Sequence, residues 1–377
     1  MPFILPDLPA VRLPDEHWTD RTLTRLGTAI DATALRALRF IIDRALVPSP
    51  GELPSLRALA EPYVTEELQQ EPRAFFSFMD APPPSPTMSG RTLRTLPGGV
   101  VIAREFSAPY RYFCPRAADD ARAFPESQRV PVEHWVHTTR RPAATIVALH
   151  GFTMGQPRFD AFVMMAHEWF RRGLDIALVT LPFHGVRAPR QARFSGELFA
   201  SRDIGRLNES VRQAVYEIRM VSDWTRRQSG APVGLLGLSL GAYLTALMAG
   251  LTDELDFAVP MLPPVCLGDL AWRLFEHSRY YRHPTPLLTR EELRTAYRVH
   301  SPLTYPLRIA RERVLIIGAR GDRIVPPEHP HALWQHWGRP SLFWFSGSHL
   351  APFRRQRIVA AVANKLTDLG ILGARAS

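Results

Sequence analysis

The five residues Gly237, Leu238, Ser239, Leu240 and Gly241 stand between an apolar run and a stretch with the composition of a helix. A serine nucleophile on a sharp strand-to-helix turn needs a small residue two positions before it and two positions after it, because larger side chains would collide where the backbone reverses. Gly237 and Gly241 meet this requirement. The amide of Leu240 then lies at the start of a helix, where unpaired N–H groups stabilise a developing oxyanion. Since a glycine-rich turn with a surface serine has the same pattern, the rest of the chain decides between the two interpretations.

Two residues downstream are candidate partners for Ser239. A serine hydroxyl is almost wholly protonated at neutral pH, so it needs a histidine that accepts its proton and an acid that orients the histidine. The apolar runs at residues 313–318 and 341–345 predict buried strands. Asp322 follows the first run in a turn that contains glycine, and His349 follows the second run. We therefore predict a triad in which Ser239 is the nucleophile, Asp322 the acid and His349 the base.

The chain order of nucleophile, acid and histidine, each after a predicted strand, resembles that of the α/β-hydrolase superfamily. The resemblance extends from about residue 95 to about residue 372 and is to serine esterases and lipases, with dienelactone-hydrolase-like and acetyl-esterase-like members as the nearest subgroups. It implies an α/β fold with a mostly parallel, doubly wound sheet, a helical cap and a helical N-terminal extension. It implies no cofactor.

Two loops upstream of Ser239 extend this resemblance. Residues 145–149 predict a strand that leads into His150 and Phe152, and this segment is similar to the family's oxyanion loop. Phe152 would supply the second oxyanion amide. The loop after the next predicted strand contains His184 and Arg187, and in this family that loop usually lines the substrate pocket. The resemblance therefore implies that His150, His184 and Arg187 contact the substrate, although a solvated loop is the alternative for Arg187.

Each of these residues has a simpler interpretation when it is taken singly. Asp322 fits an ordinary Asx turn, His349 a helix cap or a packing position, and His150 a structural hydrogen bond. Asp269 is an alternative acid, because some family members carry the acid after the strand that residues 257–262 predict here. The glycine-containing turn favours Asp322. Agreement in residue type, chain order and strand-end position together favours the intact triad.

Strand and helix patterns alternate through most of the chain, which is typical of a doubly wound sheet. Residues 99–106 and 130–136 predict initial antiparallel strands, and the parallel part begins at Thr145. Apolar residues recur at helical spacing from Ile204 onwards and predict one long helix that ends near Gly230.

Residues 1–90 are expected to form a helical extension, and residues 91–377 the hydrolase domain. Within the extension, apolar residues at helical spacing between positions 34 and 46 predict an amphipathic helix of about four turns. This helix is expected to pack on its own protein. A peripheral membrane anchor is the less favoured alternative, because no concentrated basic face accompanies it. The proline-rich segment 81–86 predicts a stiff linker at the boundary.

Residues 266–306 separate two predicted strands and are expected to form a cap over the active site. The aromatic residues of this stretch include Trp272, Phe275, Tyr280, Tyr281 and Tyr297. An aromatic lower surface would favour an apolar acyl or aryl group in the substrate. Aromatic residues at helical spacing also pack among themselves, so a purely structural role is the alternative.

The composition is typical of one large domain with an appendage. The chain has 377 residues, of which 46% are hydrophobic, and a formal net charge of +10. Lys365 is the only lysine among 46 basic residues, and the arginines are dispersed. A coding bias explains this pattern better than a binding surface does, so we do not expect nucleic-acid binding. Some attraction to anionic surfaces or substrates is compatible with the charge.

The cysteines and the first residues of the sequence indicate a compartment. Cys114 and Cys266 are too few for a disulfide framework and suit a reducing environment. The sequence begins with prolines and acids rather than with a basic leader and an apolar core. We therefore expect a cytoplasmic protein. Residues 233–251 are long and apolar enough for a membrane span, but they contain the nucleophile turn and four glycines, so we interpret them as a buried strand, turn and helix.

Together these patterns predict a serine hydrolase that cleaves a carboxylic ester of a small molecule or a lipid through an acyl-enzyme intermediate, a carboxylesterase-type (EC 3.1.1-like) activity. Thioesterases, lipid acyl hydrolases and peptidases use the same triad and are alternatives. A non-catalytic binding protein of this fold is a further alternative, although such relatives usually lack a triad residue. A metal is not expected, because His331 and His336 would fall on different helix faces and no HExxH motif is present.

Overall fold

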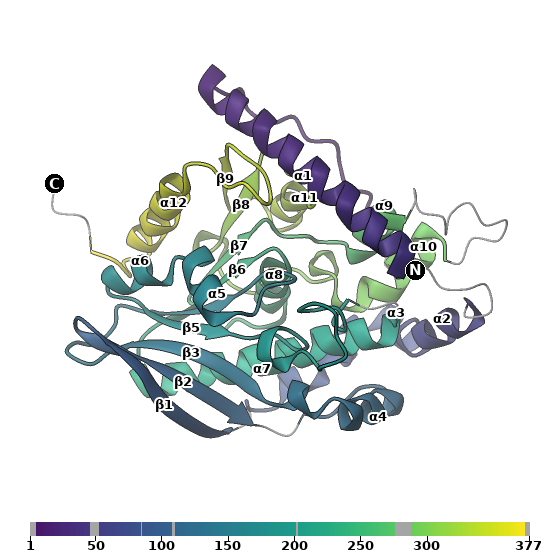
Figure 1. Cartoon of the computed structure of the whole chain (residues 1–377), viewed down its shortest axis with the longest axis horizontal. Helices are drawn as coiled ribbons and strands as arrows, with labels where there is room; N and C mark the ends of the chain where they lie inside the picture. Colours follow the sequence, from purple (N-terminus) through teal and green to yellow (C-terminus); the bar gives the residue numbers. More distant parts are fainter. Residues whose placement is uncertain are drawn as a thin grey trace.

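A nine-stranded sheet forms the centre of the fold (Figure 1). The computed structural model describes residues 5–45, 53–83, 85–107, 110–200, 203–275 and 288–373. The strands are β1 (Thr87–Leu96), β2 (Gly99–Ser107), β3 (Val130–His137), β4 (Thr145–Leu149), β5 (Asp175–Val179), β6 (Val233–Leu238), β7 (Phe257–Met261), β8 (Leu315–Ala319) and β9 (Ser341–Phe345). The expected α/β fold with a mostly parallel sheet is therefore confirmed.

The strands lie in the order β1-β2-β3-β5-β4-β6-β7-β8-β9. Pairing is antiparallel from β1 through β3 to β5, and parallel from β5 through β4 to β9. The chain passes from β4 to β5 on one side and then to β6 on the other, so the direction of winding reverses beside β4. In open α/β sheets, the carboxyl ends of the strands at such a reversal form the crevice in which ligands bind.

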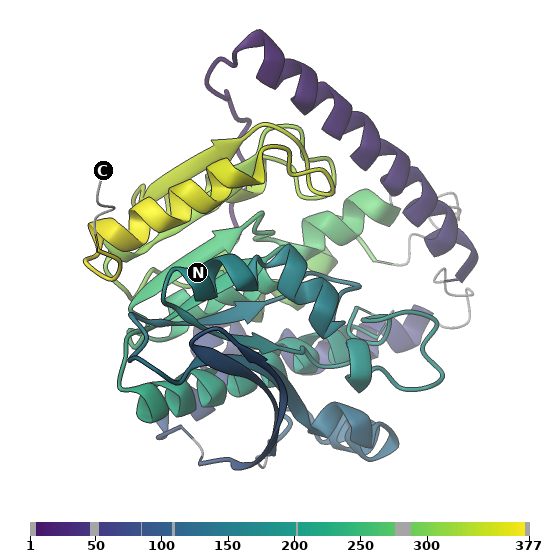
Figure 2. The same cartoon turned by 60° about the vertical axis from the view of Figure 1, so that its left-hand side comes forward.

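Helices cover both faces of the sheet (Figures 1 and 2). The α-helices are α1 (Trp18–Ala45), α2 (Leu53–Ala60), α3 (Glu66–Gln70), α4 (Pro115–Ala123), α5 (Pro157–Val163), α6 (Ala166–Arg171), α7 (Ile204–Ser229), α8 (Leu240–Leu251), α9 (Leu267–Phe275), α10 (Arg290–Tyr297), α11 (Glu328–His336) and α12 (Arg355–Asp368). Shorter 3-10 helices are η2 (Glu61–Tyr63), η3 (Pro72–Asp80), η4 (Pro125–Gln128), η5 (Gly185–Arg187), η7 (Arg298–His300), η8 (Pro302–Thr304) and η9 (Arg311–Arg313).

Two hydrophobic cores lie on the two faces of the sheet, because successive side chains of a strand point to opposite sides. In β4, Val147 and Leu149 belong to the core that includes α7 and α8. Ile146 and Ala148 belong to the core that includes α6 and α12. The central strands are therefore buried on both faces, which explains their continuously apolar sequences.

The apolar segment 233–251 forms β6, the turn at Ser239 and the buried helix α8, as interpreted from the sequence. The long helix predicted after Ile204 is also present. α7 ends at Ser229, and Gly230 follows in the left-handed conformation, with φ at 61°. No helix among the described residues combines the length and the hydrophobicity that are needed to cross a membrane.

The N-terminal part differs from the expectation in two respects. α1 begins at Trp18 and is much longer than the helix predicted at residues 34–46, of which residue 46 lies outside the described residues. β1 was not predicted; it begins at Thr87, before the expected boundary at residue 91, and pairs with β2. α1 runs beside the loops that follow β8 and β9 (Figures 1 and 2).

Candidate active site

Ser239 occupies the sharp turn between β6 and α8. Its backbone has φ of 53° and ψ of −110°, a region that non-glycine residues rarely adopt. The amide of Ser239 donates to the carbonyl oxygen of Met261 on the neighbouring strand at 2.9 Å, and the carbonyl of Ser239 accepts from the Tyr243 amide at 2.9 Å in the first turn of α8. The strained turn is thus held from both sides, and the serine stands at the carboxyl end of β6.

The two glycines of the pentapeptide are required by close backbone contacts. A Cβ atom on Gly237 would collide with the carbonyl of Gly241, and a Cβ atom on Gly241 would collide with the carbonyl of Leu149 at the end of β4. The turn therefore packs directly against the strand whose following loop was predicted to complete the site. The steric requirement inferred from the sequence is what the structure shows.

His349 lies between the other two members of the predicted triad. Its Nε2 atom is 2.9 Å from Ser239 Oγ, and its Nδ1 atom is 2.8 Å from Asp322 Oδ2. These distances allow Ser239 to donate to a neutral imidazole whose Nδ1–H donates to the carboxylate. The structure therefore brings Ser239, His349 and Asp322 together in the order that a nucleophile, a base and an orienting acid require.

Asp322 is fixed by its own loop. The amides of Ile324 and Val325 donate to Asp322 Oδ1 at 2.9 and 2.7 Å, so Oδ2 is left for His349. The alternative acid, Asp269, is engaged elsewhere: it pairs with Arg290 at 2.6 Å and with Arg294 at 2.8 Å. The geometry favours Asp322 over Asp269 as the partner of the histidine.

Two carboxylates influence the protonation of His349. Burial of the imidazole opposes its protonation, but the charge and hydrogen bond of Asp322, together with the charge of Asp31, raise the pKa of His349 above its ordinary value. An imidazole with a raised pKa is a stronger base toward the serine proton. The electrostatic arrangement is consistent with the role that the sequence predicts for this histidine.

The loop after β4 adjoins the serine on its other side. A Cβ atom built on Gly151 would lie 3.6 Å from Ser239 Cβ, so the backbone that leads into Phe152 passes next to the nucleophile. Among the described residues, the amides of Phe152 and Leu240 donate to no backbone carbonyl oxygen. Both amides are thus open candidates for the predicted oxyanion hole.

His150 and His184, from the loops after β4 and β5, are both buried, and their ring centroids are 5.0 Å apart. His150 Nε2 accepts from the Leu181 amide at 3.0 Å, and its Nδ1 lies 2.9 Å from the Gly151 carbonyl oxygen. His184 Nδ1 lies 2.8 Å from the carbonyl oxygen of Pro182. Burial lowers the pKa of His150 to about 4 and lowers that of His184 as well, which favours the neutral form of both rings. These contacts hold the two loops together and do not point to a substrate.

Arg187 lies in the interior of the protein. It is fully buried, and its guanidinium makes a bidentate pair with Glu217 of α7 at 2.7 Å for each bond. It also donates to the carbonyl oxygen of Thr180 at 2.8 Å and to that of Ser127 at 2.5 Å. The guanidinium already has acceptors from three separate segments and fixes the loop after β5 to α7, so this arrangement favours a structural role over the expected substrate contact.

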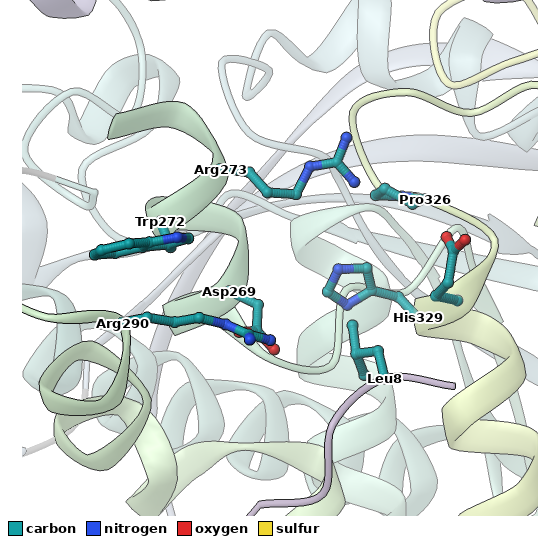
Figure 3. Close-up of a pocket in the computed structure, with 8 residues that line it drawn as sticks. Leu8, Asp269, Trp272, Arg273, Arg290, Pro326 and His329 are labelled. Carbon is teal, nitrogen blue, oxygen red and sulfur yellow. The ribbon is translucent and has the colours of Figure 1, made fainter. Parts of the chain in front are cut away.

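A cavity of about 280 Å³ lies between α9, the start of α10, the N-terminal segment and the start of α11 (Figure 3). Its lining residues are Leu8, Asp269, Trp272, Arg273, Arg290, Pro326, Glu328 and His329. Of the aromatic residues predicted for the underside of the cap, Trp272 lines this cavity and Tyr297 is buried in the core. Tyr280 and Tyr281 lie outside the described residues.

One buried carboxylate near the site was missed in the sequence. Asp31 of α1 has no exposed surface and bonds to the loops that carry Asp322 and His349. A signal was present, because Gly27 and Thr28 lie one helical turn earlier on the same face, and such small residues indicate close packing. Nothing in the local sequence, however, indicated what this face would contact.

No family model matches the chain. Two curated proteins of Mycobacterium tuberculosis, from strains CDC 1551 / Oshkosh and H37Rv, are 32% identical to it over 239 residues, and both are described as uncharacterized. The match covers 62% of this chain and 56% of each relative, so the chain matches only about half the length of these relatives.

Solved structures show the same architecture. Acetyl xylan esterase 1 from Thermoanaerobacterium sp. JW/SL YS485 superposes with a TM-score of 0.58 at 15% identity, covering 83% of this chain and 98% of that protein. An acetyl xylan esterase from Paenibacillus sp. R4 superposes with a TM-score of 0.57 at 13% identity, covering 81% and 98%. At such low identities the likeness concerns the fold. With the strand order and the turn at Ser239, it shows that this chain has the fold of the α/β-hydrolase superfamily.

Proposed function

We propose that this protein is a serine hydrolase that cleaves a carboxylic ester through an acyl-enzyme intermediate. The observation that carries the proposal is the continuous chain of hydrogen bonds from Ser239 Oγ through both nitrogens of His349 to Asp322 Oδ2, at 2.9 and 2.8 Å. A surface serine in a glycine-rich turn requires neither a histidine at that distance nor a buried carboxylate behind the histidine. The three groups have the geometry of a nucleophile with its base and orienting acid.

In the first half of the proposed reaction, Ser239 Oγ attacks the ester carbonyl carbon while its proton moves to His349 Nε2. The carbonyl oxygen becomes an oxyanion, which the amides of Leu240 and Phe152 stabilise. Asp322 stabilises the imidazolium that forms and holds it in orientation. The bond to the alcohol oxygen then breaks, the proton passes from His349 to the departing alcohol, and the acyl group stays on Ser239.

In the second half, His349 takes a proton from water, and the resulting hydroxide attacks the acyl carbon. The bond between that carbon and Ser239 Oγ breaks, and the proton returns from His349 to the serine. The carboxylic acid leaves, and the original state is restored. Ser239, His349, the substrate and water account for every proton that moves, so the proposed reaction requires no cofactor.

The proposed substrate class rests on the fold. The two structural neighbours are named as acetyl xylan esterases, which favours an ester over an amide. The cavity of about 280 Å³ has none of the triad residues in its lining (Figure 3), so it does not limit the size of the substrate. An ester of a small molecule and an ester of a lipid are both compatible with the site. The free cysteines Cys114 and Cys266 are consistent with the proposed cytoplasmic location.

A fluorophosphonate probe tests the proposal most directly, because it reacts covalently with a serine whose proton is taken by a neighbouring base. Intact-mass spectrometry of the full-length protein should show one adduct on the wild type and none on Ser239→Ala or His349→Ala. Peptide mapping should place the adduct on Ser239. A wild-type protein that shows no adduct would contradict the proposal and favour a binding protein of the same fold.

The pH dependence of ester hydrolysis is expected to reflect the raised pKa of His349. Only the neutral imidazole accepts the serine proton, so activity is lost as the pH falls through the pKa of His349 in the folded protein. Because Asp322 and Asp31 raise that pKa, the acid limb of kcat/KM should have its midpoint above about 6.5, the ordinary value for histidine. Initial rates with a short-chain chromogenic ester between acid and alkaline pH check this expectation. A midpoint in the range of an ordinary carboxylate would contradict it.

A further inference from the structure

The side chain of Asp31 connects two loops that are distant from it in the sequence. On the loop after β9, Ser348 Oγ donates to Asp31 Oδ1 at 2.8 Å, the Leu350 amide donates to Oδ1 at 3.1 Å, and the His349 amide donates to Oδ2 at 3.0 Å. On the loop after β8, the Arg323 amide donates to Oδ2 at 3.0 Å. His349 and Asp322 belong to these same two loops. One carboxylate therefore fixes the base-bearing loop against the acid-bearing loop.

The chemistry of this site requires a carboxylate. All four partners of Asp31 donate, and an ionised carboxylate is the small side chain that accepts at both of its ends. An asparagine would direct its NH₂ group at one or more backbone N–H groups, whichever way it was turned. Because Asp31 has no exposed surface, no water would replace a lost acceptor, and the unpaired donors would carry their full desolvation penalty.

α1 is packed closely enough to make this contact specific. A Cβ atom on Gly27 would lie only 2.9 Å from the Ser348 amide nitrogen, so the helix backbone touches the base-bearing loop. Thr28 Oγ1 donates to the Gly321 carbonyl oxygen at 3.1 Å, next to Asp322. Nearer the start of the helix, Asp20 pairs with Arg354 at 2.7 Å. The face of α1 that carries Gly27, Thr28 and Asp31 therefore packs tightly against the two loops.

We propose that Asp31 is a positioning residue of the hydrolase site, and that α1 is part of the active-site framework rather than an appendage. The catalytic part of this inference rests on the proposed function. The part that says Asp31 positions His349 does not depend on it. Asp31 touches no substrate. It acts by holding the imidazole of His349 at the distance from Asp322 and Ser239 that proton transfer requires, and by placing a second negative charge near that imidazole.

A test must separate the effects on His349 of the three groups that face it. Asp322 approaches from the loop after β8, Asp31 from α1, and the uncharged Ser239 from the turn after β6. Both carboxylates raise the pKa of His349, and Asp322 has the larger effect. Removing the charge of Asp31 should therefore lower the pKa of His349 without abolishing the contribution of Asp322. A residue that merely stabilised the fold would leave this pKa unchanged.

The test compares the full-length wild type with Asp31→Asn, using Asp175→Asn as the matched control. Asp175 is also buried, and it also accepts from a backbone amide and a histidine ring, those of His137, at 2.9 and 2.8 Å, but it lies at the amino end of β5, away from the site. Two quantities are measured: the pKa of His349 by NMR titration of its imidazole, and kcat for a short-chain ester. The NMR measurement needs no turnover, so it separates failure of this inference from failure of the proposed function.

We expect Asp31→Asn to lower the pKa of His349 and to lower kcat on the order of tenfold to a hundredfold, because small misplacement of a base has effects of that size. Asp175→Asn should reduce thermal stability and change neither quantity. An unchanged pKa and kcat in Asp31→Asn would overturn the inference, even if stability fell. If Asp31→Asn does not fold, Ser348→Ala is tested instead, because it removes only one of the four hydrogen bonds to Asp31. Ser348→Ala should lower kcat severalfold. An unchanged kcat in Ser348→Ala would also overturn the inference.

Discussion

Replacing Ser239 with alanine is expected to lower kcat for ester hydrolysis by roughly a millionfold, because the residues of a triad act as a unit and the acyl-enzyme cannot form without the hydroxyl. The fold should survive the change. The backbone of Ser239 is held by its amide bond to Met261 and by the helix that follows, and neither contact involves the side chain. The comparison is made by initial rates under saturating ester, with circular dichroism to verify folding.

A matched control and a double variant sharpen this experiment. Ser229→Ala removes a hydroxyl that bonds only to the Thr225 carbonyl oxygen and the Ala231 amide at the end of α7, and it should retain wild-type kcat. His349→Ala should lose about as much activity as Ser239→Ala, and the double variant should lose little more than either one, because groups that act as a unit are not additive. Near-normal turnover by Ser239→Ala, or additive losses in the double variant, would show that hydrolysis occurs elsewhere.

The parts of the fold that were predictable carry local signals. The bounds of β4 coincide with the apolar run at residues 145–149, because a strand buried on both faces must be apolar throughout. The bounds of β9 coincide with the run at residues 341–345, although four of these five residues are only partly buried. The turn at Ser239 was also predictable, because its two glycines are required by contacts within a few residues and with one neighbouring strand. The proximity of the three triad residues followed from chain order and strand ends, and their catalytic role stays a prediction.

The features that were missed depend on partners far away in the chain. β1 is exposed along almost its whole length, so it lacks the alternation of apolar and polar residues that reveals a half-buried strand. Arg187 was expected at the substrate, but its acceptors include Glu217, which is 30 positions away on a helix. Asp31 has partners between 292 and 319 positions away. A buried polar contact of this kind has no periodic pattern, so only the folded chain shows which charge meets which loop.

Replacing Asp322 with asparagine is expected to lower kcat by about ten-thousandfold, through the orientation that the loop imposes on the new side chain. The amides of Ile324 and Val325 donate to Oδ1, so the asparagine carbonyl should face them and its NH₂ group should face His349 Nδ1. Two donors cannot face each other. His349 would then carry its proton on Nε2, and it could no longer accept the proton of Ser239.

The runner-up acid provides the control, and the pH profile provides a second readout. Asp269→Asn breaks the pairs with Arg290 and Arg294 and should destabilise the packing of α9 against α10 while leaving the chemical step nearly unchanged. In Asp322→Asn, the loss of the main negative charge beside His349 should let burial lower the pKa of that imidazole, so the residual activity should persist to lower pH than in the wild type. If Asp269→Asn instead abolished turnover and Asp322→Asn did not, the acid would be Asp269. The 2.8 Å contact between Asp322 and His349 would then serve the structure of the loop alone, because an orienting acid cannot be removed without disturbing the proton transfer that depends on it.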